Sequence, residues 1–560
     1  MLLYGQLPLP AQVNVTTYHN NNFRTGENLN ETLLGQGNVN TNSFGKLFVY
    51  SVDGYVYSQP LYVSGVTVPG FGTRNVLFVA TEHNSVYAFD ADSNLGAAGG
   101  ILWHVNLGPS AATPTLDFGG RFGNYTDIVP EVGITSTPVI DLSSGTIYVD
   151  AFTHEGSAYL HRLHALNITN GLERPGSPVL VAATVPGIGV QTSNGVVVFD
   201  PRQQIQRSAL TLASGRLYIA FGGYADTNPF HGWVIGYNPV TLAQLPAYTF
   251  NTTPNSTIAA FGSDAGEAGI WMAGCGLSVN EVGDLFFASG NGSFNALNNS
   301  GGTEYGDSFL RLSTASGLSV ADYFTPYNQA NLAANDLDLG SGGLMLLPDQ
   351  PGPFPHLLMG GGKQGKIYVL NRDMMTTGNN HYNGGGSSDA IVQTVSLGGG
   401  IVNTPAYFNG RVYWVASGDR TAGFTMVNGV MSTASLTSGP RVYPYPGSTP
   451  SVSANGTSNG IIWTLLRNNP AILIASDPTN MAREIYTSAQ LAGRDQLTNG
   501  VKFAVPTVAN GKVYVGGQYA LSVFGLLGGP LKIWKDAHFG PNNRCPRCIP
   551  ALRLLSLIHI

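Results

Sequence analysis

A short β-rich word that recurs eight times constrains this chain more than any other feature of its sequence. The copies are NVLFVAT (75–81), TIYVDAF (146–152), RLYIAFG (216–222), DLFFASG (284–290), HLLMGGG (356–362), RVYWVAS (411–417), GIIWTLL (460–466) and KVYVGGQ (512–518). Most copies follow a turn that contains glycine, which reaches the positive φ angles that tight hairpins need. A period of about 50 to 70 residues indicates one β unit repeated along the chain.

Each copy has companion strands before and after it. A shorter strand, often opened by proline, precedes the word, as in QPLYV (59–63). Proline suits the first residue of a strand because no ladder N–H is lost there. A third strand follows, as in KIYVLNR (366–372), and often a fourth. The chain is therefore predicted to be all-β, an eight-bladed β-propeller of four-stranded antiparallel blades. An array of β-sandwiches is the alternative, but no linker separates the units.

The two ends of the repeat are predicted to meet. The last unit shows only three strands before Leu527, whereas the orphan strand KLFVYSV (46–52) precedes the first full unit. We expect this strand to pair into the last blade and close the ring, which removes an open sheet edge. The predicted organisation is an N-terminal extension (1–43), the propeller (44–527) and a non-repeating tail (528–560) that we expect to be foreign to the fold. The CPRC of the tail has no second pair to complete a zinc site.

Composition excludes several classes of protein. Charged residues make up 10% of the chain, its net charge is −6, and no basic patch is present, which argues against nucleic acid as a partner. No apolar run is long enough to predict a transmembrane helix. Low charge and abundant Asn, Ser and Thr indicate an exported protein, periplasmic or secreted, although MLLYGQLPLPAQV (1–13) is not evidently a signal peptide. We expect a monomer.

Three irregular segments interrupt the repeat with polar residues. Asn291 lies in ASGNGSFN, Asp338 in NDLDLGSGG, and Lys363 in the glycine-rich turn between the second and third strands of the fifth unit. If these loops share one end of the ring, the amide and carboxylate oxygens suit calcium, and the lysine could hold an electron-rich oxygen. The alternatives are a turn-capping asparagine, a solvated aspartate and an ordinary hairpin lysine.

These segments resemble, in order and rough spacing, those of the pyrroloquinoline-quinone (PQQ) type quinoprotein alcohol dehydrogenases. The likeness is greatest to bacterial secreted PQQ-like repeat proteins of unsettled activity, which share runs such as VATEHNSVYAFDAD. The resemblance implies PQQ and calcium as cofactors, with Asn291 and Asp338 on the metal, Asp338 as catalytic base and Lys363 on the quinone. For a further acidic metal ligand, Asp226 lies in the expected blade and Glu155 one blade early.

The chain also departs from that family. The adjacent cysteine pair that covers the quinone is missing, and there is no Cys-X-X-Cys-His for a c-type haem. The place of the tryptophan that stacks on the quinone matches Ala273 to Cys275, with Trp271 only nearby. Two functions therefore stay open: an exported oxidoreductase acting on an alcohol or a sugar, and a non-catalytic propeller that binds a protein partner.

Overall fold

The structure is a computed structural model in which strand follows strand almost throughout. It describes residues 13–120, 123–226, 229–257, 266–298 and 301–528. The two α-helices in this part of the chain, α1 (Gln329–Ala334) and α2 (Ala492–Asp495), are short. No helix among the described residues has the length and apolar character needed to cross a membrane.

Each of the eight repeated words forms a strand of a different sheet. These strands are β4 (Gly72–Ala80), β12 (Thr146–Glu155), β20 (Arg216–Gly223), β24 (Leu285–Ala288), β28 (Leu357–Gly361), β32 (Arg411–Val415), β37 (Ser458–Leu466) and β41 (Lys512–Leu526). The strands before them are β3 (Leu61–Val68), β11 (Val139–Asp141), β19 (Thr211–Ala213), β23 (Ser278–Val279), β27 (Met345–Leu346), β31 (Ala406–Phe408), β36 (Ser451–Asn455) and β40 (Thr507–Ala509). The predicted order of first and second strands is therefore observed in every unit.

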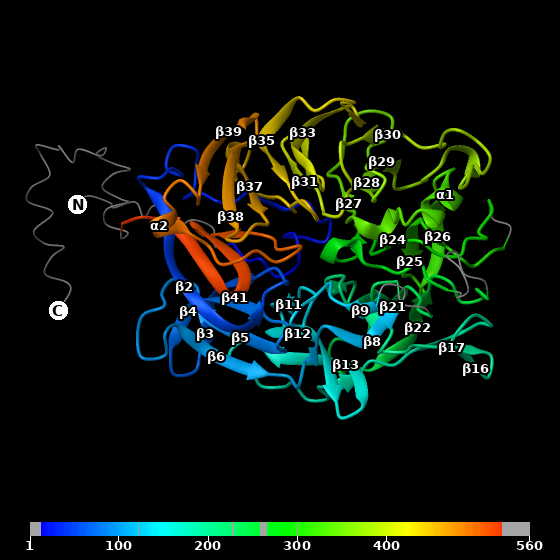
Figure 1. Ribbon diagram of the computed structural model, residues 1–560, viewed down its shortest axis with the longest axis horizontal. Coiled ribbons are helices and arrows are strands. Elements are labelled where there is room, and N and C mark those ends of the chain that lie inside the picture. Colours follow the sequence, from blue (N-terminus) through cyan, green and yellow to red (C-terminus); the bar gives the residue numbers. More distant parts are fainter. Residues whose placement is uncertain (1–12, 121–122, 227–228, 258–265, 299–300, 529–560) are drawn as a thin grey trace, which may run out of the picture.

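The third and fourth strands follow in chain order. The third strands are β5 (Ser85–Asp90), β13 (Ala158–Asn167), β21 (Trp233–Tyr237), β25 (Phe309–Ser313), β29 (Lys366–Asn371), β33 (Asp419–Val427) and β38 (Ile472–Asp477). The fourth are β6 (Ile101–Asn106), β14 (Val179–Leu180), β22 (Gln244–Asn251), β26 (Ser319–Phe324), β30 (Gln393–Ser396), β35 (Thr437–Tyr443) and β39 (Asn480–Thr487). Figure 1 shows these sheets following one another around a common centre.

Shorter strands add to this pattern between or beside the repeats. One insertion contains β7 (Ala111–Ala112), β8 (Thr115–Gly120), β9 (Gly123–Tyr125) and β10 (Glu131–Val132), and a second contains β15 (Thr184–Pro186), β16 (Thr192–Ser193) and β17 (Val196–Val198). The remaining strands are β1 (Glu27–Asn28), β2 (Phe44–Tyr55), β18 (Gln204–Ile205) and β34 (Val430–Met431). The insertion over residues 111–132 contributes to the candidate site.

The two ends of the repeat meet in the last sheet, as predicted. Strand β2 pairs antiparallel with β41, from Phe44 opposite Leu526 to Tyr50 opposite Leu521. Strand β41 itself turns back near Tyr519, whose φ is 56°. A Cβ added to Gly525 would lie 3.2 Å from the carbonyl oxygen of Gly511, whereas a straight strand would separate these residues by about 45 Å. The two arms of β41 thus supply a second and a third strand, and β2 supplies the fourth.

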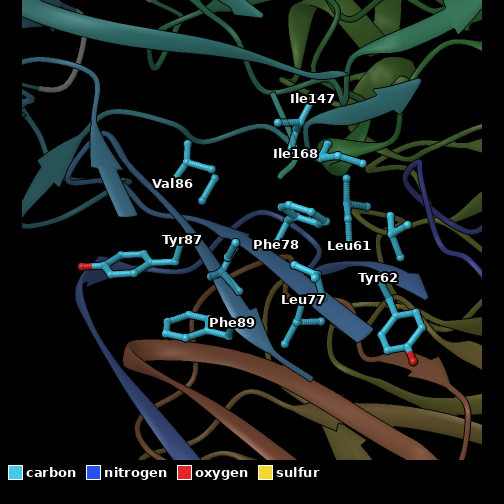
Figure 2. Close-up of a cluster of buried hydrophobic side chains, with 14 of the residues drawn as sticks. Leu61, Tyr62, Leu77, Phe78, Val86, Tyr87, Phe89, Ile147 and Ile168 are labelled. Carbon is cyan, nitrogen blue, oxygen red and sulfur yellow. The ribbon is translucent and has the colours of Figure 1, made fainter. Parts of the chain in front are cut away.

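Both faces of a sheet are buried against its neighbours. Figure 2 shows Phe78 of the first sheet beside Ile147 and Ile168 of the second, while Leu77 and Phe89 point the other way. All five side chains belong to one buried cluster that also contains residues of β41. Burial of apolar area on both faces, worth about 25 cal/mol per Å², holds adjacent sheets together.

A segment near the N-terminus, residues 15–28, fills the centre of the ring; we call it the axial segment. Its hydrogen bonds reach the first strand of each sheet, at Tyr62, Ile140, Thr211, Val279, Leu346, Tyr407, Val452 and Val508. Most of these bonds join backbone to backbone, which any sequence could make. The described part of the predicted N-terminal extension therefore packs into the ring.

Arg24 is the most deeply buried cation of the axial segment. Its side chain is 0% exposed, and Nη2 donates to the Leu277 carbonyl oxygen and to Thr211 Oγ1, each at 2.8 Å. Nη1 donates to Thr17 Oγ1 at 2.8 Å and to the Tyr18 carbonyl oxygen at 3.0 Å. Burial lowers the pKa of Arg24 to about 10, so the guanidinium stays charged at neutral pH. The charge is held by carbonyl and hydroxyl dipoles.

We expect Arg24→Met to lower the free energy of unfolding by about 3 kcal/mol or more, because it leaves buried carbonyl oxygens without donors. Urea unfolding followed by fluorescence measures the change. Arg74→Met is the matched control, since Arg74 is 43% exposed and its ion pair with Asp90 lies at the surface. Equal stability of the two variants would show that Arg24 does not hold the centre together.

Candidate functional site

The three side chains singled out in the sequence converge. The backbone N–H of Asn291 donates to Asp338 Oδ1 at 2.7 Å. Lys363 Nζ lies 2.6 Å from Asp338 Oδ2, and the Lys363 backbone N–H donates to the Asp338 carbonyl oxygen at 3.0 Å. Asn291 and Asp338 are each 4% exposed. Loops after β24, before β27 and after β28 thus bring these residues to one place.

Glycines make this approach of three loops possible. A Cβ on Gly290 would overlap the carboxylate of Asp338, and a Cβ on Gly362 would overlap the Asp338 carbonyl oxygen. The 3₁₀ turn η2 (Leu339–Ser341) follows Asp338 directly and packs Gly340 against the backbone of Ser289 and Gly290. The glycine run that precedes Lys363 in the sequence therefore has a steric reason.

Asp226 lines a cavity together with Asp338 and Lys363. The cavity has a volume of about 110 Å³, and Trp271 is among its other lining residues. Burial and the negative charge of Asp338 raise the pKa of Asp226 to about 7. Glu155, the alternative acidic ligand, is instead held by Arg162 in a bidentate ion pair, at 2.7 and 2.8 Å.

Two further carboxylates that the sequence analysis missed belong to this cluster. Asp336 pairs with Lys363 and accepts from Asn291 Nδ2 at 3.4 Å. Asp307 is fully buried, accepts from the Leu339 N–H at 3.0 Å, and has its pKa held well above the usual range by burial and by Asp338. Asp336 could have been found, because it shares the Asp-Leu-Asp motif of Asp338.

The carboxylates at this site outnumber its one lysine, and one amide oxygen there accepts no hydrogen bond. Burial lowers the pKa of Lys363, but the carboxylates of Asp338 and Asp336 outweigh it and raise that pKa overall. Asn291 Oδ1 is buried and has no hydrogen-bond partner. Among the described residues, no three His, Cys, Asp or Glu side chains are close enough together to hold a metal ion by themselves. A cation here would need the asparagine oxygen as a ligand.

Trp271 lines the cavity, although the sequence placed it only near the expected position. A Cβ on Gly222, Gly269 or Gly290 would overlap its indole, so the ring lies against three glycines. Its Nε1 donates to the Gly223 carbonyl oxygen at 2.8 Å, and the side chain is half-buried. Cys275, at the position expected from spacing, is fully buried. The irregular turn η1 (Met272–Gly274) begins directly after Trp271.

The insertion over residues 111–132 supplies another wall of the cavity, through Tyr125 and Asp127. Asp127 is tied to the loop before β40 by Lys502, at 3.2 Å. Phe118 of the same insertion stacks on Tyr224, with ring centroids 4.5 Å apart. Contacts with two distant parts of the ring therefore hold the insertion over the cavity.

Comparison with known proteins establishes the fold and nothing finer. No family model and no curated protein matches the chain. A quinohemoprotein alcohol dehydrogenase from Pseudomonas putida HK5 is similar with a TM-score of 0.57 and 14% identity, over 92% of this chain and 80% of that one. A europium-containing methanol dehydrogenase is similar with a TM-score of 0.56 and 13% identity, over 93% of this chain and 99% of that one. BamB from Moraxella catarrhalis is similar with a TM-score of 0.46 and 12% identity, over 86% of this chain and 97% of that one. The likeness to the two dehydrogenases supports a propeller fold of the PQQ type.

Glu82, beside the centre of the ring, gives the structure a testable pH dependence. The residue is fully buried, and burial raises its pKa to about 8 despite hydrogen bonds from the Gly133 N–H and Thr135. The folded state therefore binds more protons than the unfolded state between about pH 4.5 and 8, and Glu82 makes stability fall as pH rises through that window.

We expect Glu82→Gln to remove this loss. Relative to the wild type, the variant should gain about 4 kcal/mol in free energy of unfolding between pH 5 and pH 9. Denaturant unfolding at both pH values measures it. Glu281→Gln is the control, because Glu281 is 58% exposed and Arg372 lowers its pKa. A constant difference between Glu82→Gln and wild type across the window would contradict the neutral form of Glu82.

Proposed function

We propose that this chain is an exported, monomeric oxidoreductase that uses PQQ and calcium to oxidise alcohols or sugars, built on an eight-bladed propeller closed by β2. The contacts that Asn291 and Lys363 both make with Asp338, beside a cavity lined by Asp338 and Lys363, carry the proposal. Asn291 and Asp338, which are 47 residues apart in the chain, are in contact there. Low charge and polar composition support the location outside the cytoplasm.

The residues fit a hard cation. Calcium takes six to eight oxygen ligands at about 2.3–2.6 Å. Asn291 Oδ1 is a buried oxygen without a partner, and the carboxylates of Asp338 and Asp226 line the same cavity. A cation would also offset the repulsion that, with burial, raises the pKa of Asp226. We assign these three residues as the metal ligands.

The fit to the quinone is partial. Trp271 offers an aromatic face on a glycine floor, and Lys363 offers a cation for electron-rich oxygens. The cavity of about 110 Å³ is smaller than the 300–1,000 Å³ of most ligand sites, so Tyr125 and Asp127 would have to move outward to admit a cofactor of this size. When bound, PQQ would accept the electrons of the alcohol and calcium would polarise its carbonyl.

The chain's own part in the reaction is to place a base. Asp338 would accept the proton of the substrate hydroxyl, a role that requires hydrogen-bond reach of that proton. The Asn291 N–H and Lys363 hold the two oxygens of this carboxylate, so its orientation is set before a substrate arrives. Lys363 would also stabilise negative charge that develops on a neighbouring oxygen.

A non-catalytic propeller that binds a protein partner is the second candidate. The small cavity and the missing cysteine pair favour it. In that case the carboxylate cluster would serve only to fix three loops, and no quinone would enter.

We expect the full chain to bind PQQ only in the presence of calcium. Asp338→Asn and Lys363→Met should each weaken binding at least about 10-fold, since each removes a charged contact worth about 1.5–3 kcal/mol. Calorimetry measures the affinity, and dye reduction with a panel of alcohols and sugars measures the activity.

Lys366→Met is the matched control. Lys366 lies three positions from Lys363 in the same hairpin, but its ammonium sits over the Tyr327 ring, 5.4 Å from the centroid. Binding of PQQ without calcium, or equal binding by all variants, would reject the assigned ligands. Absence of PQQ binding to the wild type would reject the oxidoreductase and favour the scaffold.

A further inference from the structure

Arg207 is a cation without a counter-ion among the described residues. It lies between β18 and β19, and its guanidinium carbon sits 4.0 Å from the centroid of the Phe503 ring. Within the described part of the chain its guanidinium makes no hydrogen bond and no ion pair, and its Nε is buried without an acceptor. A guanidinium has five N–H donors, and leaving the buried Nε donor unpaired is costly.

Arg207 faces two voids along the axis of the ring. It lines the candidate cavity of about 110 Å³ together with Asp226, Asp338 and Lys363. It also lines a smaller void of about 10 Å³, which Tyr18 of the axial segment bounds. Tyr18 is 2% exposed. A ligand in the larger cavity would lie beside Arg207, which lines that cavity.

Two other cations at or near the cavity have counter-ions. Lys363 is already compensated by Asp336 and Asp338. Lys502 is compensated by Asp127. Glu82, whose pKa Arg207 lowers slightly, makes its hydrogen bonds through Oε2 with the Gly133 N–H and Thr135 and forms no ion pair with Arg207. Arg207 thus remains the uncompensated cation among the described residues that line the cavity.

We propose that Arg207 is a carboxylate-binding residue, and that the ligand of the axial cavity carries a carboxylate directed at its guanidinium. Arginine matches a carboxylate with two parallel N–H donors, and a half-buried site strengthens such a pair. A volume of about 110 Å³ is that of three or four water molecules at about 30 Å³ each, enough for a two- or three-carbon hydroxy acid. The carboxylate could also belong to PQQ, in which case this inference rests on the proposed function.

The test compares pairs of similar ligands, one with and one without a free carboxylate. Glycolate and ethylene glycol have the same heavy-atom skeleton apart from one carboxylate oxygen, and PQQ can be compared with its trimethyl ester. Binding of the small ligands to the full chain is followed by ligand-observed NMR, and binding of PQQ and its ester with calcium by tryptophan fluorescence. The variants are Arg207→Gln and Arg207→Lys. Arg216→Gln is the control, because Arg216 lies in the same sheet and also stacks on an aromatic ring, at 4.0 Å from Tyr248.

We expect the wild type and Arg216→Gln to bind glycolate over ethylene glycol, and Arg207→Gln to bind glycolate at least about 10-fold more weakly. Arg207→Lys should retain part of the affinity. If Arg207→Gln weakens the binding of PQQ but not of its ester, the cofactor supplies the carboxylate. If the variant weakens the binding of glycolate alone, the substrate supplies it. Glycolate binding does not need PQQ, so failure of the proposed function leaves this result readable.

Two results would overturn the proposal. One is equal binding of both glycolate and PQQ by wild type and Arg207→Gln. The other is a wild type that binds neither ligand, which would leave only water at Arg207. If Arg207→Gln fails to fold, Arg207→Lys and the preference of the wild type for charged over neutral ligands decide the question in the same way.

Discussion

The hydrogen bonds of the axial segment are the interaction on which the rest of this structure depends. Eight sheets that converge on one axis leave space there and first strands whose inner edges lack a neighbour. Residues 15–28 occupy that space and bond to the first strand of every sheet, with Arg24 held entirely by dipoles. Tyr18 of the same segment lines the smaller of the two voids beside Arg207.

Charge placement within the candidate cavity explains why a ligand is expected. On one side, several carboxylates share a single lysine, and burial together with their mutual repulsion raises the pKa values of Asp226 and Asp307. On the other side, Arg207 has no counter-ion. An arrangement of this kind is costly for an empty site and favourable for one that receives a cation and an anion. These charges are therefore better explained by the binding of a ligand than by a contribution to the stability of the fold.

Much of the fold could be predicted from the sequence, because every copy of the repeated word had to bury both faces and so kept its pattern. The pairing of β2 with β41 followed from an orphan strand and a missing one. The loops of Asn291, Asp338 and Lys363 were visible as breaks in that repeat. The axial segment could not be recognised in the sequence, because its hydrogen bonds are mostly between backbone atoms and leave no periodic pattern. The positions of Arg207 and Trp271 at the cavity depend on irregular segments, for which residue spacing is a poor guide.

The most direct measurement is a crystal structure of the full chain grown with calcium and soaked with PQQ, with anomalous scattering used to identify the metal. We expect calcium at about 2.3–2.6 Å from Asn291 Oδ1 and from carboxylate oxygens of Asp338 and Asp226, with the quinone against Trp271 and the Tyr125 wall displaced. Calcium bound elsewhere, or a cavity that keeps its present residues in contact and admits neither group, would contradict a quinoprotein site.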